Sequence, residues 1–299
     1  MTARLEPGSP GFYDRLADAL AGLYKRALTD LPPDVRSAVA TAAEREDGAA
    51  RTRLNIMVKA VGTSDETGMI VCQDTGICVF FVRIGTRFPL DGSALHTALE
   101  AGIERATARY GLRSSIVHPL SRQNRQTGTG PGVPVVHLDF EPGSDVLDIL
   151  LMPKGSGSEN MSFLAMLNPA DGIGGVQRFV IDCVLAAGPR PCPPTVVGVG
   201  LGGTADACMA LAKRATLRPI GQRHPEPDIA TLETGLLDAV NTLGIGPQGL
   251  GGATTAFAVA VEYAWTHISM NPVAVSIQCW RGERARLRIH ADGTLEHGY

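Results

Sequence analysis

The segment Thr195-Val-Val-Gly-Val-Gly-Leu-Gly-Gly-Thr204, which runs on into Ala205-Asp-Ala-Cys-Met-Ala-Leu-Ala, decides how the chain folds. Residues 195–199 predict a buried strand, and residues 204–217 predict a helix that begins directly after a cluster of glycines. A strand, a tight turn and a helix in this order indicate a protein that combines sheet and helix. The G-x-G-x-x-G spacing of residues 198–203 is also typical of a loop that holds a dinucleotide phosphate.

The dinucleotide interpretation has a weakness and a rival. An acidic residue is expected about 20 positions further on, and that region reads Pro219-Ile-Gly-Gln-Arg-His224 instead. The rival interpretation is a strand-to-helix turn packed too tightly for side chains, and the sequence favours it. A second glycine cluster, Lys154-Gly-Ser-Gly-Ser-Glu-Asn160, could wrap an oxyanion with backbone donors or could be a surface turn.

The rest of the chain extends this pattern. Periodicity and turn residues predict helices over 13–27, 33–46, 49–61, 93–110, 175–187 and 229–243, and strands over 68–72, 78–84, 133–140, 146–152, 256–265, 273–280 and 285–290. We expect strands 133–140 and 146–152 to form a pair, and 281–283 to form a hairpin-like turn. These elements predict an α+β fold with mixed sheets, a single domain over residues 1–299, and a helical N-terminal cap over residues 1–65.

Composition excludes several classes of protein. Among 299 residues, 44% are hydrophobic and 19% are charged, which is enough apolar material for a core and unlike a disordered chain. The net charge is -3 with no basic stripe, so we expect no nucleic-acid partner. No run of about 18 apolar residues predicts a membrane span, and the N-terminus lacks a secretory signal. We therefore expect a cytoplasmic protein.

Six cysteines are too sparse in a chain of this length for a disulfide scaffold. Cysteine is among the most buried residue types, so packing is the default interpretation for each. We assign Cys78, Cys183 and Cys208 to packing, because they lie on apolar faces. The other three have neighbours that suit a metal site, although their spacing cannot show that they converge; these are Cys72 before Gln73-Asp74, Cys192 between prolines, and Cys279 at the end of a strand.

At these residues the chain resembles the alpha subunit, or N-terminal half, of the iron–sulfur hydro-lyases, a family of class I fumarases and L(+)-tartrate dehydratases. Matching segments run in order from about residue 50 to residue 290; they are Cys72–Gly76, Lys154–Ser162, Cys192–Thr204, Arg218–Gly221, Ile245–Gly252 and Pro272–Trp280. The resemblance implies a [4Fe–4S] cluster held by Cys72, Cys192 and Cys279, with one iron left open. That iron would bind the substrate hydroxyl as a Lewis acid.

The resemblance also implies the substrate contacts. Gln73 and Arg113 would bind substrate, the arginine by pairing a carboxylate, and Gly155 would donate a backbone N–H. Asp74 and His267 would be catalytic, with Asp74 as a proton carrier. Each of these two has a structural alternative, since Asp74 could simply form the turn before Gly76 and a lone histidine is usually structural.

The chain ends at Tyr299, soon after Cys279, which leaves no room for the second domain of full-length family members. We therefore expect a separate beta subunit that carries the rest of the active site, a small dicarboxylate substrate, and a dimer of alpha–beta units. Fumarate hydratase, interconverting malate and fumarate, is the leading function. L(+)-tartrate dehydratase, which forms oxaloacetate, is the alternative. A non-catalytic homologue and a nucleotide-binding protein are the remaining hypotheses.

Overall fold

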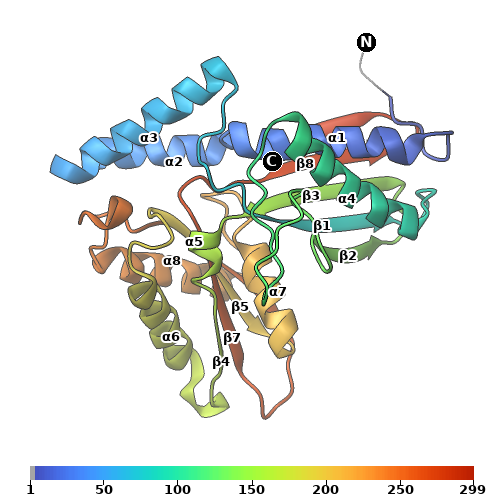
Figure 1. Ribbon diagram of the computed structural model, residues 1–299. Coiled ribbons are helices and arrows are strands. Elements are labelled where there is room, and N and C mark those ends of the chain that lie inside the picture. Colours follow the sequence, from blue (N-terminus) through green and yellow to red (C-terminus); the bar gives the residue numbers. More distant parts are fainter. Residues whose placement is uncertain (1–3) are drawn as a thin grey trace. The chain divides into compact units, whose positions relative to one another are not determined.

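The computed structural model describes residues 4–299 (Figure 1). The chain divides into two compact units, and neither is continuous in sequence. Unit 1 consists of Met1–Asp30, Ser64–Lys154 and Glu283–Tyr299, and unit 2 consists of Leu31–Thr63 and Gly155–Gly282. Each unit contains its own sheet and its own hydrophobic core.

Unit 1 is a five-stranded mixed sheet with helices α1 and α4 packed on it. Its elements are α1 (Phe12–Thr29), β1 (Ile77–Gly85), α4 (Gly92–Arg109), β2 (Val135–Glu141), β3 (Val146–Lys154), β8 (Ala285–His290) and β9 (Leu295–Gly298). The strand order is β2-β1-β3-β8-β9, in which only the β1–β2 pair is parallel. Leucines of α1 at near-helical spacing are buried against one face of this sheet.

Two local features define α4 and its contact with α1. The Asp91 side chain caps the helix by accepting the N–H groups of Ser93 (2.9 Å) and Ala94 (3.2 Å). Gly111 follows the helix in the left-handed region with φ 59°, a conformation in which glycine commonly ends a helix. Inside the helix, a Cβ on Gly102 would lie 2.6 Å from the Leu20 Cβ, so glycine allows the two helices to approach closely.

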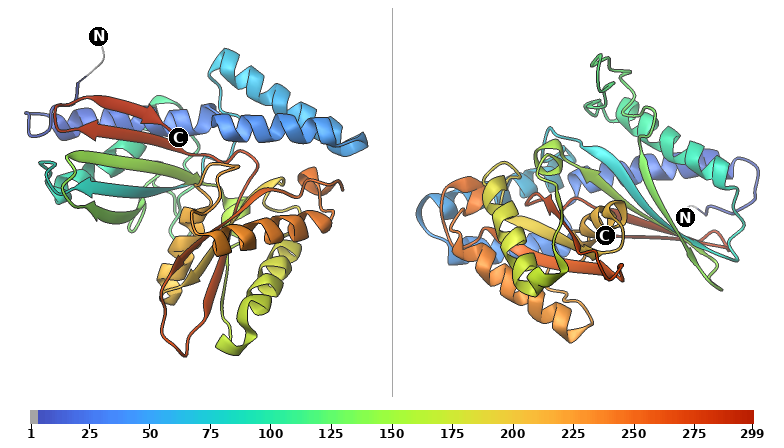
Figure 2. Two further views of the ribbon diagram at one scale, coloured as in Figure 1. Left: turned by 180° about the vertical axis from the view of Figure 1, so that it is seen from behind. Right: turned by 90° about the horizontal axis from the view of Figure 1, so that it is seen from below.

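Unit 2 is a four-stranded mixed sheet with helices on both faces. Its elements are α2 (Pro33–Arg45), most of α3 (Gly48–Thr67), α5 (Ser156–Glu159), β4 (Phe163–Met166), η1 (Pro169–Asp171), α6 (Gly172–Ala187), β5 (Thr195–Gly202), α7 (Ala205–Ala215), α8 (Pro227–Thr242), η2 (Pro247–Gly249), β6 (Ala256–Ala264) and β7 (Pro272–Gln278). The strand order is β4-β7-β5-β6, and only β5–β6 is parallel. Helices α6 and α8 pack on one face and α7 on the other (Figures 1 and 2).

The α+β class and the mixed sheets are confirmed, and three local predictions are wrong. Strands β2 and β3 are not neighbours, because β1 lies between them and pairs with both. Residues 281–283 form no hairpin, because β7 and β8 belong to different sheets. Residues 68–72 form no strand. Each of these predictions rested on a local pattern, but strand pairing is decided by partners far away in sequence.

The helices expected in the first 65 residues are present, but the two units share them. Helix α1 lies in the core of unit 1, while α2 and most of α3 belong to unit 2. That residues 1–299 act as one catalytic domain stays a prediction. Within residues 4–299, no helix combines the length and the apolar character needed to cross a membrane.

Candidate active site

The six cysteines separate into a buried set and an accessible set. None of them is in a disulfide among residues 4–299. Cys78, Cys183 and Cys208 are buried, as their assignment to packing requires, and burial raises the pKa of Cys78 and Cys183 to about 12 and that of Cys208 to about 11. Cys192 is exposed, and Cys72 and Cys279 are partly exposed. The accessible set is the set that the resemblance assigns to the cluster.

Unit 2 contains two of the three predicted ligands, on segments joined by a backbone hydrogen bond. The backbone N–H of Trp280 donates to the carbonyl of Cys192 at 3.2 Å, so the residues that carry these thiols lie on adjoining loops. Cys192 has φ 56°, a left-handed conformation that is uncommon outside glycine and is found at functional sites. Pro191 and Pro193 beside it are buried while Cys192 is exposed. A rigid, accessible thiol of this kind suits a thiolate ligand.

Unit 1 joins the segment that carries Gln73 and Asp74 to the segment that carries Arg113. Buried Thr75 donates its hydroxyl to the Arg113 carbonyl at 2.7 Å, and Tyr24 donates its hydroxyl to the Thr75 carbonyl at 2.8 Å. The Asp74 Oδ1 atom accepts the Gly76 N–H at 3.0 Å, so the turn-forming role considered for Asp74 is real and coexists with any catalytic role.

Glycine is required at the end of this segment. Gly76 has φ 72°, and a Cβ there would lie 2.8 Å from backbone atoms of Lys154, the last residue of β3. The next residue, Ile77, pairs with Lys154 in the sheet. The Cys72–Gly76 segment therefore lies directly against the strand end that leads into Gly155.

His267 lies at the opposite end of unit 2 from Cys279. All seven residues of β7 separate the two, and at about 3.3 Å per residue they span about 20 Å. Two hydrogen bonds hold the loop at that end. The Thr266 hydroxyl donates to the Gly203 carbonyl (2.9 Å), and the Leu167 N–H donates to the Asn271 carbonyl (2.9 Å). The structure thus does not place His267 near Cys279 of its own chain.

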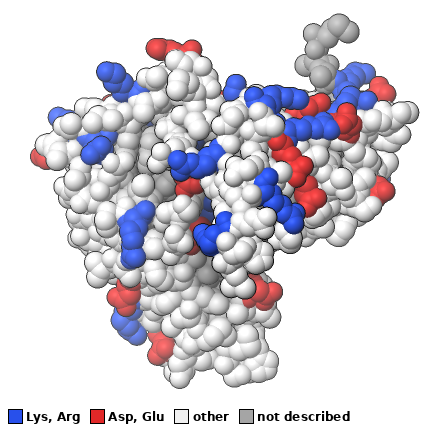
Figure 3. Space-filling view, viewed as in Figure 1, with Lys and Arg blue, Asp and Glu red and all other residues white. Residues whose placement is uncertain are grey.

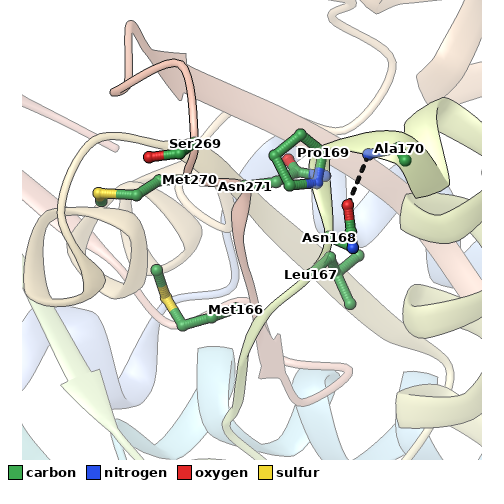
Figure 4. A pocket seen from close by; sticks show the side chains of 8 residues that line it. All are labelled: Met166, Leu167, Asn168, Pro169, Ala170, Ser269, Met270 and Asn271. Atoms are coloured by element: carbon green, nitrogen blue, oxygen red, sulfur yellow. Dashed lines mark hydrogen bonds between the residues drawn. The ribbon is translucent and has the colours of Figure 1, made fainter.

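The loop around His267 is exposed and partly apolar. Trp265 and Ile268, which flank the histidine, are 93% and 92% exposed. The Ser269 N–H donates to the histidine Nδ1 at 3.2 Å, so the neutral ring carries its proton on Nε2. Next to this loop is a hollow of about 690 Å³ between 166–170 and 269–271 (Figure 4).

The glycines of β5 serve packing. A Cβ on Gly198 would lie 2.1 Å from the Ala212 carbonyl oxygen, and one on Gly200 would lie 2.0 Å from that of Cys208. Helix α7 therefore packs directly against β5. This close packing is what the sequence analysis favoured for the strand-to-helix turn. Nothing in this arrangement supports the dinucleotide hypothesis. On the face shown in Figure 3, basic and acidic side chains are interspersed, without a basic stripe.

Arg218, from another matching segment, is also structural. It is 10% exposed and forms ion pairs with Glu233, which is fully buried, and with Glu262. It also donates to the Val261 carbonyl at 2.7 Å, and the Val261 N–H donates to Glu233 at 2.8 Å. This network fastens the segment after α7 to β6.

The predicted ligands and substrate contacts are divided between the units: Cys72, Gln73, Asp74 and Arg113 lie in unit 1, and Gly155, Cys192, His267 and Cys279 lie in unit 2. Within residues 4–299, no three His, Cys, Asp or Glu side chains are grouped so that they could hold a metal ion. Sequence reasoning gave no role to Thr75 or Tyr24, because nothing in the sequence connects residues 51 positions apart.

Comparison with known proteins identifies the family. Residues 17–288 match the family described as fumarate hydratase (fumerase). The chain belongs to the fumarate hydratase family. As a member it is a hydro-lyase, an enzyme that adds or removes water at a carbon–carbon double bond.

Two curated relatives of this fumarate hydratase family member are similar over nearly their whole length. A putative L(+)-tartrate dehydratase subunit alpha from Methanocaldococcus jannaschii is 41% identical over 286 residues, covering 94% of this chain and all of the relative. The L(+)-tartrate dehydratase subunit alpha of Escherichia coli K12 is 36% identical over 289 residues, covering 95% and 94%. These names favour the alternative of the sequence analysis, tartrate dehydratase, over its leading function.

Proposed function

We propose that this chain is the alpha subunit of a hydro-lyase that dehydrates L(+)-tartrate. The observation that carries the proposal is the 41% identity to a protein named as a tartrate dehydratase alpha subunit, over the whole of that relative. The arrangement in unit 1 supports it chemically, because Arg113 and Asp74 lie on segments joined by the Thr75 hydrogen bond. A cation for a carboxylate and an acidic group for a proton are what this reaction requires.

We assign a [4Fe–4S] cluster to Cys72, Cys192 and Cys279. The donor set fits, since these are the three accessible thiols and two of them lie on adjoining loops. When bound, such a cluster would supply a Lewis-acidic iron for the substrate hydroxyl. Because the ligation is by thiolates, a reducing compartment such as the cytoplasm suits the enzyme.

The remaining residues would bind the substrate and move its proton. The Arg113 guanidinium pairs one carboxylate, and the Gln73 amide orients an oxygen of the substrate. The backbone N–H of Gly155, which precedes the short helix α5, donates to the substrate. The Asp74 carboxylate exchanges the proton at the carbon next to the one that loses its hydroxyl, and the hydrogen bond from Gly76 keeps this carboxylate in one orientation.

His267 needs a different explanation, because β7 holds it about 20 Å from Cys279. We propose that it serves the site of a second copy of this chain in the assembled enzyme. Its exposed position supports this role, as do the two exposed apolar side chains, Trp265 and Ile268, that a partner surface would cover. The Nε2–H of the ring would then donate to substrate bound in the other copy.

A separate beta subunit would complete the site. A dicarboxylate carries two negative charges, and Arg113 offers a counter-charge for one of them. Both relatives described above are named as alpha subunits, which supports a partner that supplies the second cation. We expect alpha–beta units that form dimers.

Malate is the second candidate substrate. The family whose model matches residues 17–288 carries the name fumarate hydratase, which supports malate as a substrate. Malate lacks one hydroxyl of tartrate, so the choice between them depends on whether a polar group pairs with that hydroxyl.

The test is a reconstituted alpha–beta enzyme, assayed anaerobically with L(+)-tartrate and with L-malate. We expect turnover of both, with the higher kcat/KM for tartrate, and negligible turnover by this chain alone. A higher kcat/KM for malate would reverse the assignment of substrate, and turnover of neither acid would refute the hydro-lyase proposal.

A further inference from the structure

Thr75 is the buried residue of an otherwise accessible segment. It is 1% exposed, whereas Gln73 is exposed and Cys72 and Asp74 are partly exposed. A threonine directed into the protein interior needs a partner for its hydroxyl. Here that partner is the carbonyl of Arg113, 38 residues away in sequence and 2.7 Å from the hydroxyl oxygen.

The bond matters because of where Arg113 lies. Residues 112–116 belong to no helix or strand, so their position depends on individual hydrogen bonds. The Leu112 N–H donates to the Thr107 carbonyl at 3.1 Å and ties the segment to the end of α4. The Thr75 hydroxyl then fixes the backbone at Arg113 itself, from which the guanidinium extends.

The other side of Thr75 is fixed as well. Its carbonyl accepts the Tyr24 hydroxyl at 2.8 Å, and Tyr24 is a buried residue of α1. Burial, together with the neighbouring Cys78 thiol, raises the pKa of Tyr24 far above its usual range, so this hydroxyl stays protonated and remains a donor. Thr75 therefore joins the core of unit 1 to Arg113 through two hydrogen bonds in series.

We propose that Thr75 is a positioning residue whose hydroxyl holds the Arg113 backbone beside the Gln73–Asp74 pair, so that the carboxylate-binding arginine and the acidic residue keep one spacing. The proposal rests on the proposed function, in which Arg113 pairs a substrate carboxylate. Thr75 itself touches no substrate and acts only through Arg113.

The experiment compares Thr75→Val with Thr75→Ser in the reconstituted alpha–beta enzyme. Valine keeps the shape of threonine and removes the hydroxyl, whereas serine keeps the hydroxyl. We expect Thr75→Val to raise the KM for the dicarboxylate about 10-fold with kcat within about twofold of wild type, because weaker carboxylate binding affects ground state and transition state alike. Thr75→Ser should stay within about twofold of wild type in both constants.

A matched control separates positioning from general stability. Thr107→Val also removes a buried threonine hydroxyl, which in this case donates to the Ile103 carbonyl at 2.8 Å within α4, and it keeps the backbone carbonyl that accepts the Leu112 N–H. We expect it to lower thermal stability about as much as Thr75→Val without raising KM. Equal KM values for Thr75→Val and wild type, or equal rises for Thr75→Val and Thr107→Val, would overturn the proposal.

Amide hydrogen exchange gives a readout that needs no turnover. In the same enzyme, peptides covering residues 111–116 should exchange faster in Thr75→Val than in Thr75→Ser or Thr107→Val. Unchanged exchange would count against the positioning role. If wild type turned over neither tartrate nor malate, the proposed function would fail, and the exchange comparison would still decide whether Thr75 holds Arg113 in place.

Discussion

The Trp280 N–H lies 3.2 Å from the Cys192 carbonyl oxygen, so two loops separated by most of unit 2 in sequence adjoin at the residues that carry two accessible thiols. The hydrogen bond is between backbone atoms and leaves the thiol chemistry of Cys192 and Cys279 unchanged. Any substitution of these thiols therefore tests ligation without removing the bond that holds the loops together.

Replacing Cys192 or Cys279 by serine should abolish cluster binding. Serine is a poor ligand for iron–sulfur clusters, so absorbance at about 400 nm and bound iron should be lost, and kcat should fall at least about 100-fold. The control is Cys183→Ala, which removes a buried thiol from a core of unit 2. It should keep iron and colour at the cost of about 1–2 kcal/mol in unfolding free energy. Loss of the cluster in Cys183→Ala, or its retention in both serine variants, would contradict the assignment.

Alkylation should separate the two sets of thiols in the chain without cluster. Burial raises the pKa of Cys78, Cys183 and Cys208 to between about 11 and 12, so these groups stay protonated at pH 8.5, where only a thiolate reacts. Mass spectrometry after iodoacetamide treatment at pH 8.5 should find label on Cys72, Cys192 and Cys279 only. Unfolding in urea should make all six reactive. Native labelling of Cys208 would show that α7 does not cover β5 as described.

Mixed assemblies should reveal whether His267 acts on another copy. In the reconstituted alpha–beta enzyme, assemblies that contain only His267→Ala chains or only Cys279→Ser chains should be nearly inactive. The first should have a kcat lowered about 100-fold. A purified hybrid with one chain of each kind should recover about half of wild-type activity, because the chain with intact cysteines receives an intact histidine from the other copy. An inactive hybrid would mean that His267 serves its own chain, and normal activity of the enzyme with only His267→Ala chains would mean that it serves no site.

The contact between β5 and α7 should make Gly200→Ala severely destabilising. The new Cβ would fall 2.0 Å from the Cys208 carbonyl oxygen, so the helix must move, at a cost of about 3 kcal/mol. Gly235→Ala in α8 is the matched control, since its Cβ meets nothing within 4 Å and alanine should stabilise the helix by about 0.5–1 kcal/mol. Chemical denaturation measures both. Similar stability of the two variants would show that α7 can shift without cost.

Local structure was predictable from sequence and pairing was not. Periodicity placed α1 and α4 well, because the leucines of one helix face recur at a local spacing. The sheet orders escaped prediction because they depend on distant partners, as in the pairing of β3 with β8, where the Arg286 side chain also donates to the Asp148 carboxylate, 138 residues away. The edge strands β4 and β9, four residues each, were missed because their pattern is too short to read.

The site shows the same division. The accessible thiols are the same three that the family resemblance indicated, because a sequence motif can be recognised without knowing how the chain packs. The position of His267 could not be read from its twelve-residue separation from Cys279. A separation in sequence fixes no distance in space, since a loop can fold back on itself whereas the extended strand β7 keeps these two residues far apart. The role of Thr75 was equally hidden, because its partner Arg113 is reached only through the fold.

The interleaving of the two units governs when the protein can fold during synthesis. The chain passes from one unit to the other four times, after Asp30, Thr63, Lys154 and Gly282. The sheet of unit 2 is incomplete until β7 has left the ribosome and that of unit 1 until β9 has, so the nascent polypeptide carries two unfinished cores through most of translation. Both sheets are completed only within the last residues of the chain, so unpaired strand edges stay exposed until synthesis is nearly over.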